Sequence, residues 1–424
     1  MYISRYERTI YLIGFMKYLL LLLAIAIVGT NAKLAWWEEV GAVNVSSGTM
    51  ENPRFYVDVG KNSSVYIYWG FSTNRSVCFT KFSFDHKPLS GVKCYQGYYG
   101  SQYYLTGKGD DKVLYIVYSA PRKGSGYECS SSSTDGCYET YFVESADDGL
   151  TWSSPVKVPR KDMDDQYHRT LPKALYIPHT DRIVIFYVMS ASAILPSTSV
   201  RFTARSTGST VWSTEKTITS NGIYAFTELN AYYSKDGPNT YLHVFALQAT
   251  FGFHYLRSTT NGVSWERKLL LSGENSYSCH PVHEPDLYSN ILFAACSYNY
   301  YNMQFLSSED FGATWRYKQF PKNDSSYIYT YSVAFSPEGK AKDKIALILL
   351  QRNYQDNEVI LYNVATQEYR QNTEVPKFTS AVSTKWYLDG RGMSHVRVIW
   401  PKNYQNATYQ IYHPAGSTTE NIAY

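Results

Sequence analysis

The sequence predicts an all-β fold, a single β-propeller of six or seven four-stranded blades. Two observations support this prediction: an eight-residue turn motif recurs along the chain, and short apolar strands recur at a similar spacing. The composition agrees, because 42 tyrosines and 17% aromatic residues favour strands.

The turn motif has the pattern Ser-x-Asp-x-Gly-x-Thr-Trp and is complete at residues 145–152 and 308–315. A third copy at 258–265 keeps Ser, Gly and Trp but has Thr260 in place of the aspartate, and a fourth at 206–212 is eroded further. Their tryptophans follow one another at intervals of 60, 53 and 50 residues, which is in the range of propeller repeats. The chain is therefore expected to be a repeat protein.

Each position of the motif has a physical role in a tight turn. Glycine supplies a positive φ, the aspartate and hydroxyl side chains bond nearby backbone N–H groups, and the tryptophan packs beneath the turn. Alternating residues at 139–144 and 154–158 flank the first copy, so the motif joins two strands of a hairpin. The motif residues expected to be structural are Ser145, Asp147, Gly149, Trp152, Ser258, Gly262, Trp265, Ser308, Asp310, Gly312 and Trp315.

One strand in each repeat is strongly apolar, and there are seven such strands. They lie at residues 65–69, 113–117, 182–186, 241–245, 291–295, 345–349 and 395–399. Each unit has room for four strands with the motif between the third and the fourth, except that the last unit ends after 407–413. Residues 34–45 are expected to supply its missing strand and so close the ring without an exposed edge.

The first 32 residues read as a secretory signal, which leaves residues 33–424 for the propeller. Residues 18–28 form a short apolar core after Lys17, and small residues precede Lys33. Eleven residues are too few to span a bilayer, so no membrane span is expected in the mature chain. A signal anchor and a start at Met16 instead of Met1 are the alternatives.

Two further features predict a secreted protein. Asn-x-Ser/Thr sequons, which are sites of glycosylation, occur at Asn44, Asn62, Asn74, Asn323 and Asn406. The six cysteines form near neighbours that predict three disulfides, although six cysteines allow about 15 connectivities. The predicted pairs are Cys78 with Cys94, Cys129 with Cys137, and Cys279 with Cys296.

The net charge and the spacing of possible metal ligands argue against a nucleic-acid-binding protein and against a metalloprotein. A net charge of +4 with 18% charged residues gives no strong attraction to nucleic acid. His280, His283 and Glu284 do not form the His-Glu-x-x-His pattern, so no metal site and no cofactor are expected.

The turn motif resembles the Asp-box, or bacterial neuraminidase repeat, of the sialidase superfamily. The resemblance implies that the boxes lie away from the active site and that the propeller has six blades, whereas the apolar strands of this chain number seven. It covers most of the mature chain as architecture.

Candidate site residues lie where the innermost strands of the blades open at one end of the axis. Guanidinium groups match carboxylate geometry, so a cluster of arginines, carboxylates and tyrosine fits an acidic sugar. The candidates for substrate binding are Arg54, Arg169, Glu228 and Arg352.

The resemblance to sialidases implies three arginines on the sugar carboxylate, a tyrosine nucleophile activated by a glutamate, and an aspartate acid/base. Arg54 resembles the first arginine, although the Arg-Ile-Pro context of the family is absent. Tyr331, in a Tyr-Ser pair after a box, resembles the nucleophile, and Glu284 resembles its base. Asp58 is the nearest candidate for the acid/base. No arginine lies between Glu284 and Trp315, where the family places one.

Two function classes fit these residues. One is a secreted exo-glycosidase of sialidase type, which releases terminal sialic acid or a related sugar. The other is a catalytically inactive propeller that binds a glycan or a glycoprotein, as lectin-like and adhesion proteins do, with tyrosines stacked on sugar faces. A fold does not decide between the two, and only two of the three arginines are found.

Overall fold

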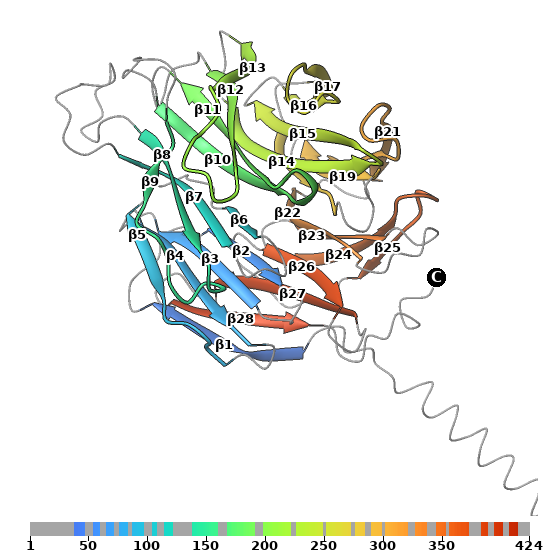
Figure 1. Ribbon diagram of the computed structural model, residues 1–424. Helices are drawn as coiled ribbons and strands as arrows, with labels where there is room; N and C mark the ends of the chain where they lie inside the picture. The colour runs from blue at the N-terminus through green and yellow to red at the C-terminus, as the bar shows by residue number, and fades with distance from the viewer. Residues whose placement is uncertain are drawn as a thin grey trace, which may run out of the picture.

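The computed structural model describes the chain between residues 38 and 413, with gaps. The described segments are 38–46, 54–59, 65–71, 76–83, 87–96, 104–107, 114–121, 138–159, 168–190, 198–221, 226–248, 252–272, 276–284, 290–298, 302–320, 327–336, 345–352, 356–372, 383–388, 394–401 and 407–413. They form seven four-stranded antiparallel sheets, which we number blades 1 to 7 (Figure 1). The all-β propeller predicted from the sequence is confirmed.

Blades 1 to 4 follow one another along the chain. Blade 1 contains β2 (Arg54–Val59), β3 (Val65–Phe71), β4 (Ser76–Phe82) and β5 (Lys93–Gln96). Blade 2 contains β6 (Tyr104–Gly107), β7 (Leu114–Pro121), β8 (Tyr138–Ser145) and β9 (Val156–Lys157). Blade 3 contains β10 (His168–Ile177), the short 3-10 helix η2 (Pro178–Thr180), β11 (Arg182–Ser190), β12 (Thr198–Ser206) and β13 (Lys216–Asn221). Blade 4 contains β14 (Phe226–Asp236), β15 (Asn239–Gln248), β16 (Gly252–Ser258) and β17 (Glu266–Ser272).

The remaining three blades complete the ring, and the last one takes a strand from the start of the chain. Blade 5 contains β18 (Ser276–Val282), β19 (Leu292–Tyr298), β20 (Asn302–Ser308) and β21 (Arg316–Phe320). Blade 6 contains β22 (Ile328–Phe335), β23 (Ile345–Arg352), β24 (Asp356–Asn363) and β25 (Tyr369–Asn372). Blade 7 contains β26 (Ser383–Leu388), β27 (Ser394–Pro401), β28 (Ala407–His413) and β1 (Glu38–Ser46).

Strand β1 closes the ring as expected from the missing last strand. It pairs antiparallel with β28, with Glu38 opposite His413, and the two strands lie side by side in Figure 1. The seven apolar strands found in the sequence lie in the second strands of the seven blades. The described residues therefore form seven blades, whereas the resemblance implies six.

The first strand of each blade lies innermost. Strands β10 and β14 contact each other, as do β18 and β22, β22 and β26, and β26 and β2, so the inner strands line one axis. Because every blade repeats the same strand order, all inner strands run in the same direction along this axis. We call the end where they begin the start end. The hairpins between third and fourth strands lie at the opposite end, which we call the box end.

The hydrophobic core lies between neighbouring blades, as β11 illustrates. Its residues alternate between two faces, and each face is covered by another sheet. Val184, Phe186 and Val188 pack into a cluster with blade 4, whereas Ile183 and Ile185 pack into a cluster with blade 2. Burial on both faces explains why the second strands are continuously apolar in the sequence.

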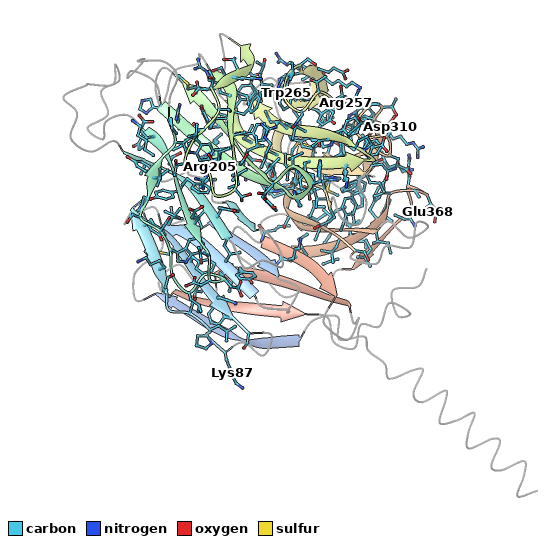
Figure 2. The ribbon with its side chains drawn as sticks, viewed as in Figure 1. Lys87, Arg205, Arg257, Trp265, Asp310 and Glu368 are labelled. Atoms are coloured by element: carbon cyan, nitrogen blue, oxygen red, sulfur yellow. A yellow bond between two sulfur atoms is a disulfide. The ribbon has the colours of Figure 1, made fainter. Side chains whose placement is uncertain are left out.

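The Asp-boxes form the hairpins between the third and fourth strands of blades 2 to 5. In the first box, Ser145 Oγ accepts a hydrogen bond from the Gly149 amide at 2.8 Å, and Asp147 Oδ1 accepts one from the Thr151 amide at 2.8 Å. In the third box, Thr260 Oγ1 replaces the carboxylate and accepts from the Ser264 amide at 2.8 Å. Figure 2 labels Trp265 and Asp310 in the boxes of blades 4 and 5. The hydroxyl therefore preserves the main-chain bond of the aspartate.

Two of the predicted disulfides are present. Cys78 pairs with Cys94 across β4 and β5, and Cys279 pairs with Cys296 across β18 and β19. The predicted pair of Cys129 and Cys137 lies outside the described residues, as do the signal segment 1–32 and the sequons at Asn62, Asn74, Asn323 and Asn406. Asn44 lies in β1. Within the described segments, no helix has the length and apolar character needed to cross a membrane.

Candidate functional site

Four consecutive inner strands are irregular near the start end of the axis. The register between first and second strands shifts between Thr170 and Lys173 in β10, between Phe226 and Glu228 in β14, between Ser276 and Ser278 in β18, and between Thr330 and Ser332 in β22. A bulge leaves residues unpaired, bends the strand and re-aims a side chain, and bulges are common beside active sites. The start end of blades 3 to 6 is therefore the candidate functional site.

Tyr331 is the extra residue of the bulge in β22. Tyr277 holds the equivalent position in β18 and Thr227 holds it in β14. Tyr277 and Thr227 were missed from the sequence, although Tyr277-Ser278 repeats the Tyr-Ser pair of Tyr331-Ser332. The position of Tyr331 is thus one of a repeated set on neighbouring inner strands.

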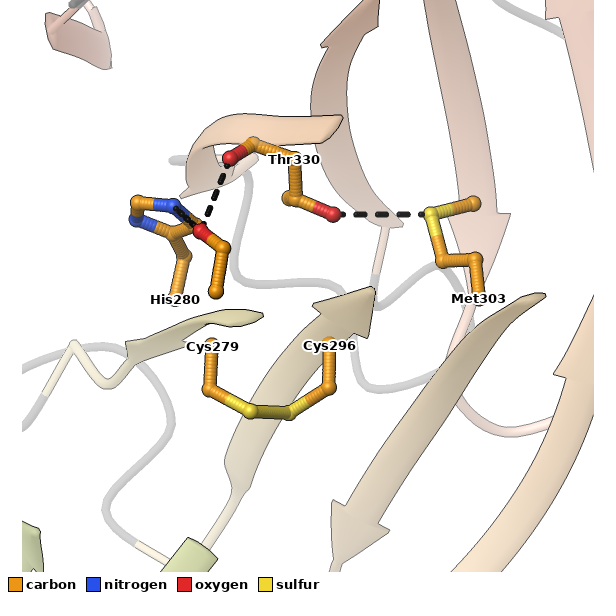
Figure 3. Close-up of a disulfide and its surroundings, with 6 residues drawn as sticks. Cys279, His280, Cys296, Met303 and Thr330 are labelled. Carbon is orange, nitrogen blue, oxygen red and sulfur yellow. Dashed lines mark hydrogen bonds between the residues drawn. A yellow bond between two sulfur atoms is a disulfide. The ribbon is translucent and has the colours of Figure 1, made fainter. Parts of the chain in front are cut away.

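Ser278 connects β18 to β22 beside this bulge, next to His280 and Thr330, which Figure 3 labels. Its Oγ lies 2.7 Å from His280 Nε2 and 3.1 Å from the carbonyl oxygen of Thr330. A carbonyl can only accept, so the Ser278 hydroxyl donates to Thr330 and His280 Nε2–H donates to Ser278. The disulfide of Cys279, between these two residues, ties β18 to β19. The half-buried hydroxyl and imidazole are therefore held in fixed positions one residue from Tyr331.

Glu284 follows β18 and forms an ion pair with Lys385 of β26. Glu284 Oε1 lies 2.9 Å from Lys385 Nζ, and both side chains are about one quarter exposed. Strand β22 lies between β18 and β26 around the axis, so this ion pair joins blade 5 to blade 7.

The contact of Ser278 with Thr330 also implies that the backbones of Glu284 and Tyr331 lie far apart along the axis. Tyr331 comes one residue after Thr330, whereas β18 continues for four residues after Ser278 and Glu284 comes later still. At roughly 3.3 Å per residue, the backbones of Glu284 and Tyr331 are separated by about 10 Å or more along the axis. The backbone of Glu284 therefore lies toward the box end, and its carboxylate pairs with Lys385.

Arg169 begins on an inner strand but extends away from the axis. Its guanidinium bonds Glu215 at 2.5 Å, beside the outer strand β13, and also donates to the carbonyl oxygens of Val158 and Pro159 after β9 of blade 2. The side chain is fully buried and lies over the Tyr187 ring. Its structural role is therefore to join blades 2 and 3.

Glu215 is the centre of this buried network. It also accepts hydrogen bonds from Arg201 at 2.5 Å and from the Tyr187 hydroxyl. Burial raises the pKa of Glu215, but the bonds from Tyr187 and Arg201 and the charges of both arginines outweigh burial, so the pKa lies below its ordinary value. The carboxylate is therefore ionised and holds both guanidinium groups.

The pairing of the strands shows where the backbones of the other candidate site residues lie along the axis. Arg54 opens β2 at the start end, Glu228 follows the bulge of β14, and Arg352 ends β23 opposite Ile328, also at the start end. Asp58 lies four residues beyond Arg54, toward the box end. The side chains of Arg54, Asp58, Tyr331 and Arg352 lie outside what the structure describes. In the described part of the chain, no three His, Cys, Asp or Glu side chains group as metal ligands.

Comparisons with known proteins show the fold. No protein-family model and no curated protein sequence matches the chain. A polysaccharide lyase named Uly1 matches with a TM-score of 0.52 at 11% identity, over 85% of this chain and 89% of that one. An ulvan lyase described as a new polysaccharide lyase family matches with a TM-score of 0.53 at 11% identity, over 88% and 95%. The NanB sialidase of Streptococcus pneumoniae matches with a TM-score of 0.47 at 8% identity, over 89% and 92%.

The chain is thus a β-propeller whose fold is shared with solved polysaccharide lyases, and sialidase structures match it as well. At these identities the matches show the architecture alone.

Proposed function

We propose that this protein is a glycan-binding propeller that takes an acidic carbohydrate at the start end of its axis. The observation that carries the proposal is the run of bulges on β10, β14, β18 and β22, all at this end. A bulge can re-aim the side chain of its extra residue, so bulges on neighbouring strands suit a ligand site at this end of the axis.

The residues at this mouth suit a sugar. Sugar hydroxyls need fixed donors and acceptors, which Ser278 and His280 supply, and sugar faces need aromatic surfaces, for which the bulge tyrosines are the candidates. Arg54 opens β2 at the same end and is the candidate for an acidic group. One solved lyase with this fold is described as bound to a -[GlcA(1-4)Rha3S]- unit, which is an acidic sugar chain.

The arrangement of Glu284 favours binding over turnover. A general base must lie within hydrogen-bond reach of the group that it activates, about 2.6–3.2 Å. Glu284 instead faces Lys385 and is displaced along the axis from Tyr331. Hydrolysis of sialosides is the second candidate function, and the observation that favours it is the place of Tyr331 on a bulge of an inner strand.

A glycan array of acidic and neutral sugars, probed with the wild-type protein, tests the proposal. We expect binding to acidic glycans, a loss of at least tenfold in affinity for Ser278→Ala and His280→Gln, and no change for His179→Gln. His179 is the matched control because η2 lies at the box end. Binding that is equal for neutral and acidic glycans, or no binding at all, would overturn the proposal.

A fluorogenic sialoside separates the two candidate functions. We expect no turnover by the wild type. Turnover that Tyr331→Phe abolishes while the protein stays folded would replace the binding proposal with the sialidase reading.

A further inference from the structure

Four polar side chains are buried together between blades 4 and 5, at the box end and away from the proposed glycan site. They are Ser234 of β14, His243 of β15, Tyr255 of β16 and His283 after β18, and none is more than 4% exposed. Buried polar groups are costly unless hydrogen-bonded, so the donor and the acceptor of each contact described below can be assigned.

Both ring nitrogens of His283 face backbone carbonyl oxygens. Nδ1 lies 2.6 Å from the oxygen of Ile291 in its own blade, and Nε2 lies 2.8 Å from the oxygen of Tyr233 on β14 of blade 4. A carbonyl oxygen only accepts, and a neutral imidazole has a single N–H. A neutral ring would leave one nitrogen lone pair pressed against a carbonyl lone pair in a buried site.

We propose that His283 is held as an imidazolium whose second proton fastens blade 5 to blade 4. Each N–H then donates to a carbonyl, one in each blade. Charge-assisted hydrogen bonds of this kind are shorter and stronger than neutral ones.

The rest of the cluster is satisfied by the same assignment. His283 Nε2–H also lies 3.2 Å from Ser234 Oγ, which can accept from it. The Ser234 hydroxyl then donates to His243 Nε2 at 2.5 Å, and His243 Nδ1–H donates to the Tyr255 oxygen at 2.7 Å. The Tyr255 hydroxyl donates to the Phe311 carbonyl at 3.4 Å. Reversing these bonds would keep both rings neutral, with Ser234 donating to His283 Nε2, but the lone pair of that nitrogen would then lie 2.8 Å from the Tyr233 carbonyl oxygen. The charged assignment avoids this repulsion.

The protonation state of His243 agrees with this hydrogen-bond assignment. Burial, followed by the positive charges of His283 and Arg257, holds the pKa of His243 well below its ordinary value, so this ring is neutral. A charged ring at His283 is one of the reasons why a second charge at His243 is unfavourable.

Other charged and titratable groups surround the cluster. Arg257 on β16 pairs with Glu266 at 2.8 Å and donates to the Phe311 carbonyl, and Asp310 lies in the box beside it. The chain neighbour Glu284 pairs with Lys385, and the Tyr232 ring meets His283 edge-on at 6.0 Å.

The proposal makes the junction of blades 4 and 5 sensitive to pH. A proton bound more tightly by the folded chain than by the unfolded chain stabilises the fold, fully so below the unfolded pKa of about 6.5. This stabilisation is lost as the pH rises above that value. In the acid range, the lowered pKa values of His243, His254 and His179 act in the opposite sense, because the unfolded chain then takes up the protons.

Nuclear magnetic resonance of the full chain with ¹⁵N-labelled histidine tests the protonation state at pH 7. Among the nine histidines, we expect His283 to show protons on both ring nitrogens, and His283→Gln identifies its signals by their loss. A spectrum in which His283 is a neutral tautomer would overturn the proposal. If His283→Gln does not fold, Ser234→Ala assigns the ring instead, because removing the hydroxyl shifts only the Nε2 signals of His243 and His283.

Thermal unfolding between pH 6 and 9 tests the consequence. The wild-type midpoint should fall by several degrees over this range, and the midpoint of His283→Gln should stay level. His254→Gln is the matched control, because His254 is a buried histidine on β16 of the adjoining blade 4 that should leave the alkaline decline unchanged. If the unfolding midpoint falls equally with pH in the wild type and in His283→Gln, His283 does not carry the proposed second proton.

Discussion

The indole of Trp152 packs edge-on against the ring of Phe79, with ring centroids 4.9 Å apart and an interplanar angle of 69°. Trp152 closes the box of blade 2, and Phe79 lies on β4, the third strand of blade 1. Three further pairs repeat this contact around the ring: Trp212 with Phe142, Trp265 with Phe202, and Trp315 with Tyr255. Each box therefore packs against the third strand of the preceding blade, which gives these hairpins a role in holding the ring together.

The glycine of the box should tolerate no side chain where it meets that aromatic ring. Gly149 has φ of 87°, and a Cβ placed on it would lie 2.7 Å from the Phe79 ring. A left-handed residue with a side chain costs about 1–2 kcal/mol, and overpacking adds about 1–3 kcal/mol. We expect Gly149→Ala to lower the free energy of unfolding by about 2–5 kcal/mol in urea titrations.

Gly208→Ala is the matched control for this prediction. Gly208 has φ of 72° in the eroded box, but a Cβ there would meet nothing within 4 Å. Gly208→Ala should lower the free energy of unfolding only by the cost of the left-handed backbone, about 1–2 kcal/mol. Equal losses for the two variants would show that the contact of Gly149 with Phe79 contributes nothing.

The carboxylate of the box predicts a loss of stability in acid. The side-chain and backbone hydrogen bonds of Thr151 lower the pKa of Asp147 to about 2. A lowered pKa stabilises the fold above the unfolded value of about 3.9, and this stabilisation is lost as the pH falls toward 2. In thermal unfolding, Asp147→Asn should lower the midpoint at pH 5, and the gap to the wild type should shrink by pH 2. A gap that is the same at both pH values would argue against the ionised carboxylate as its cause.

Periodic features of the fold could be predicted from the sequence, because they depend on local patterns. The box residues, the seven apolar second strands and the closing strand β1 all repeat a period or complete one. The bulge at Tyr277 could not be found, since a register shift depends on how two strands pair. The direction of Arg169 could not be found either, because its partner Glu215 is 46 residues away and reaches it only in the folded sheet.

The two described disulfides should differ in how they are reduced. Cys94 is exposed, whereas Cys279 and Cys296 are at most 1% exposed. Thiolate attack needs access to a sulfur, so dithiothreitol should open the Cys78–Cys94 bond in the native protein and leave the other intact. Pulsed alkylation with mass spectrometry measures this order, and simultaneous labelling of all four cysteines would contradict it.

Removing each disulfide tests how much it contributes to the free energy of unfolding. The bonds span 16 and 17 residues, and loops of this length predict about 3 kcal/mol each in the chain-entropy model. We expect the double variants Cys78→Ala/Cys94→Ala and Cys279→Ala/Cys296→Ala to lose similar free energies of unfolding. A loss limited to one of them would point to an effect other than loop closure.

The ion pair of Arg169 with Glu215 predicts a large loss of stability without a loss of glycan binding. Both side chains are at most 4% exposed, and removing one partner of a buried pair costs about 3–5 kcal/mol because the other charge is left without it. Arg169→Met keeps most of the volume and should show this loss in urea unfolding. Arg201→Met, at a guanidinium that is 21% exposed, should cost less, because water replaces part of its bond to Glu215. Glycan binding by the folded fraction of Arg169→Met should equal that of the wild type, since its guanidinium extends away from the axis toward blade 2. A variant that keeps its stability and loses binding would place Arg169 at the ligand after all.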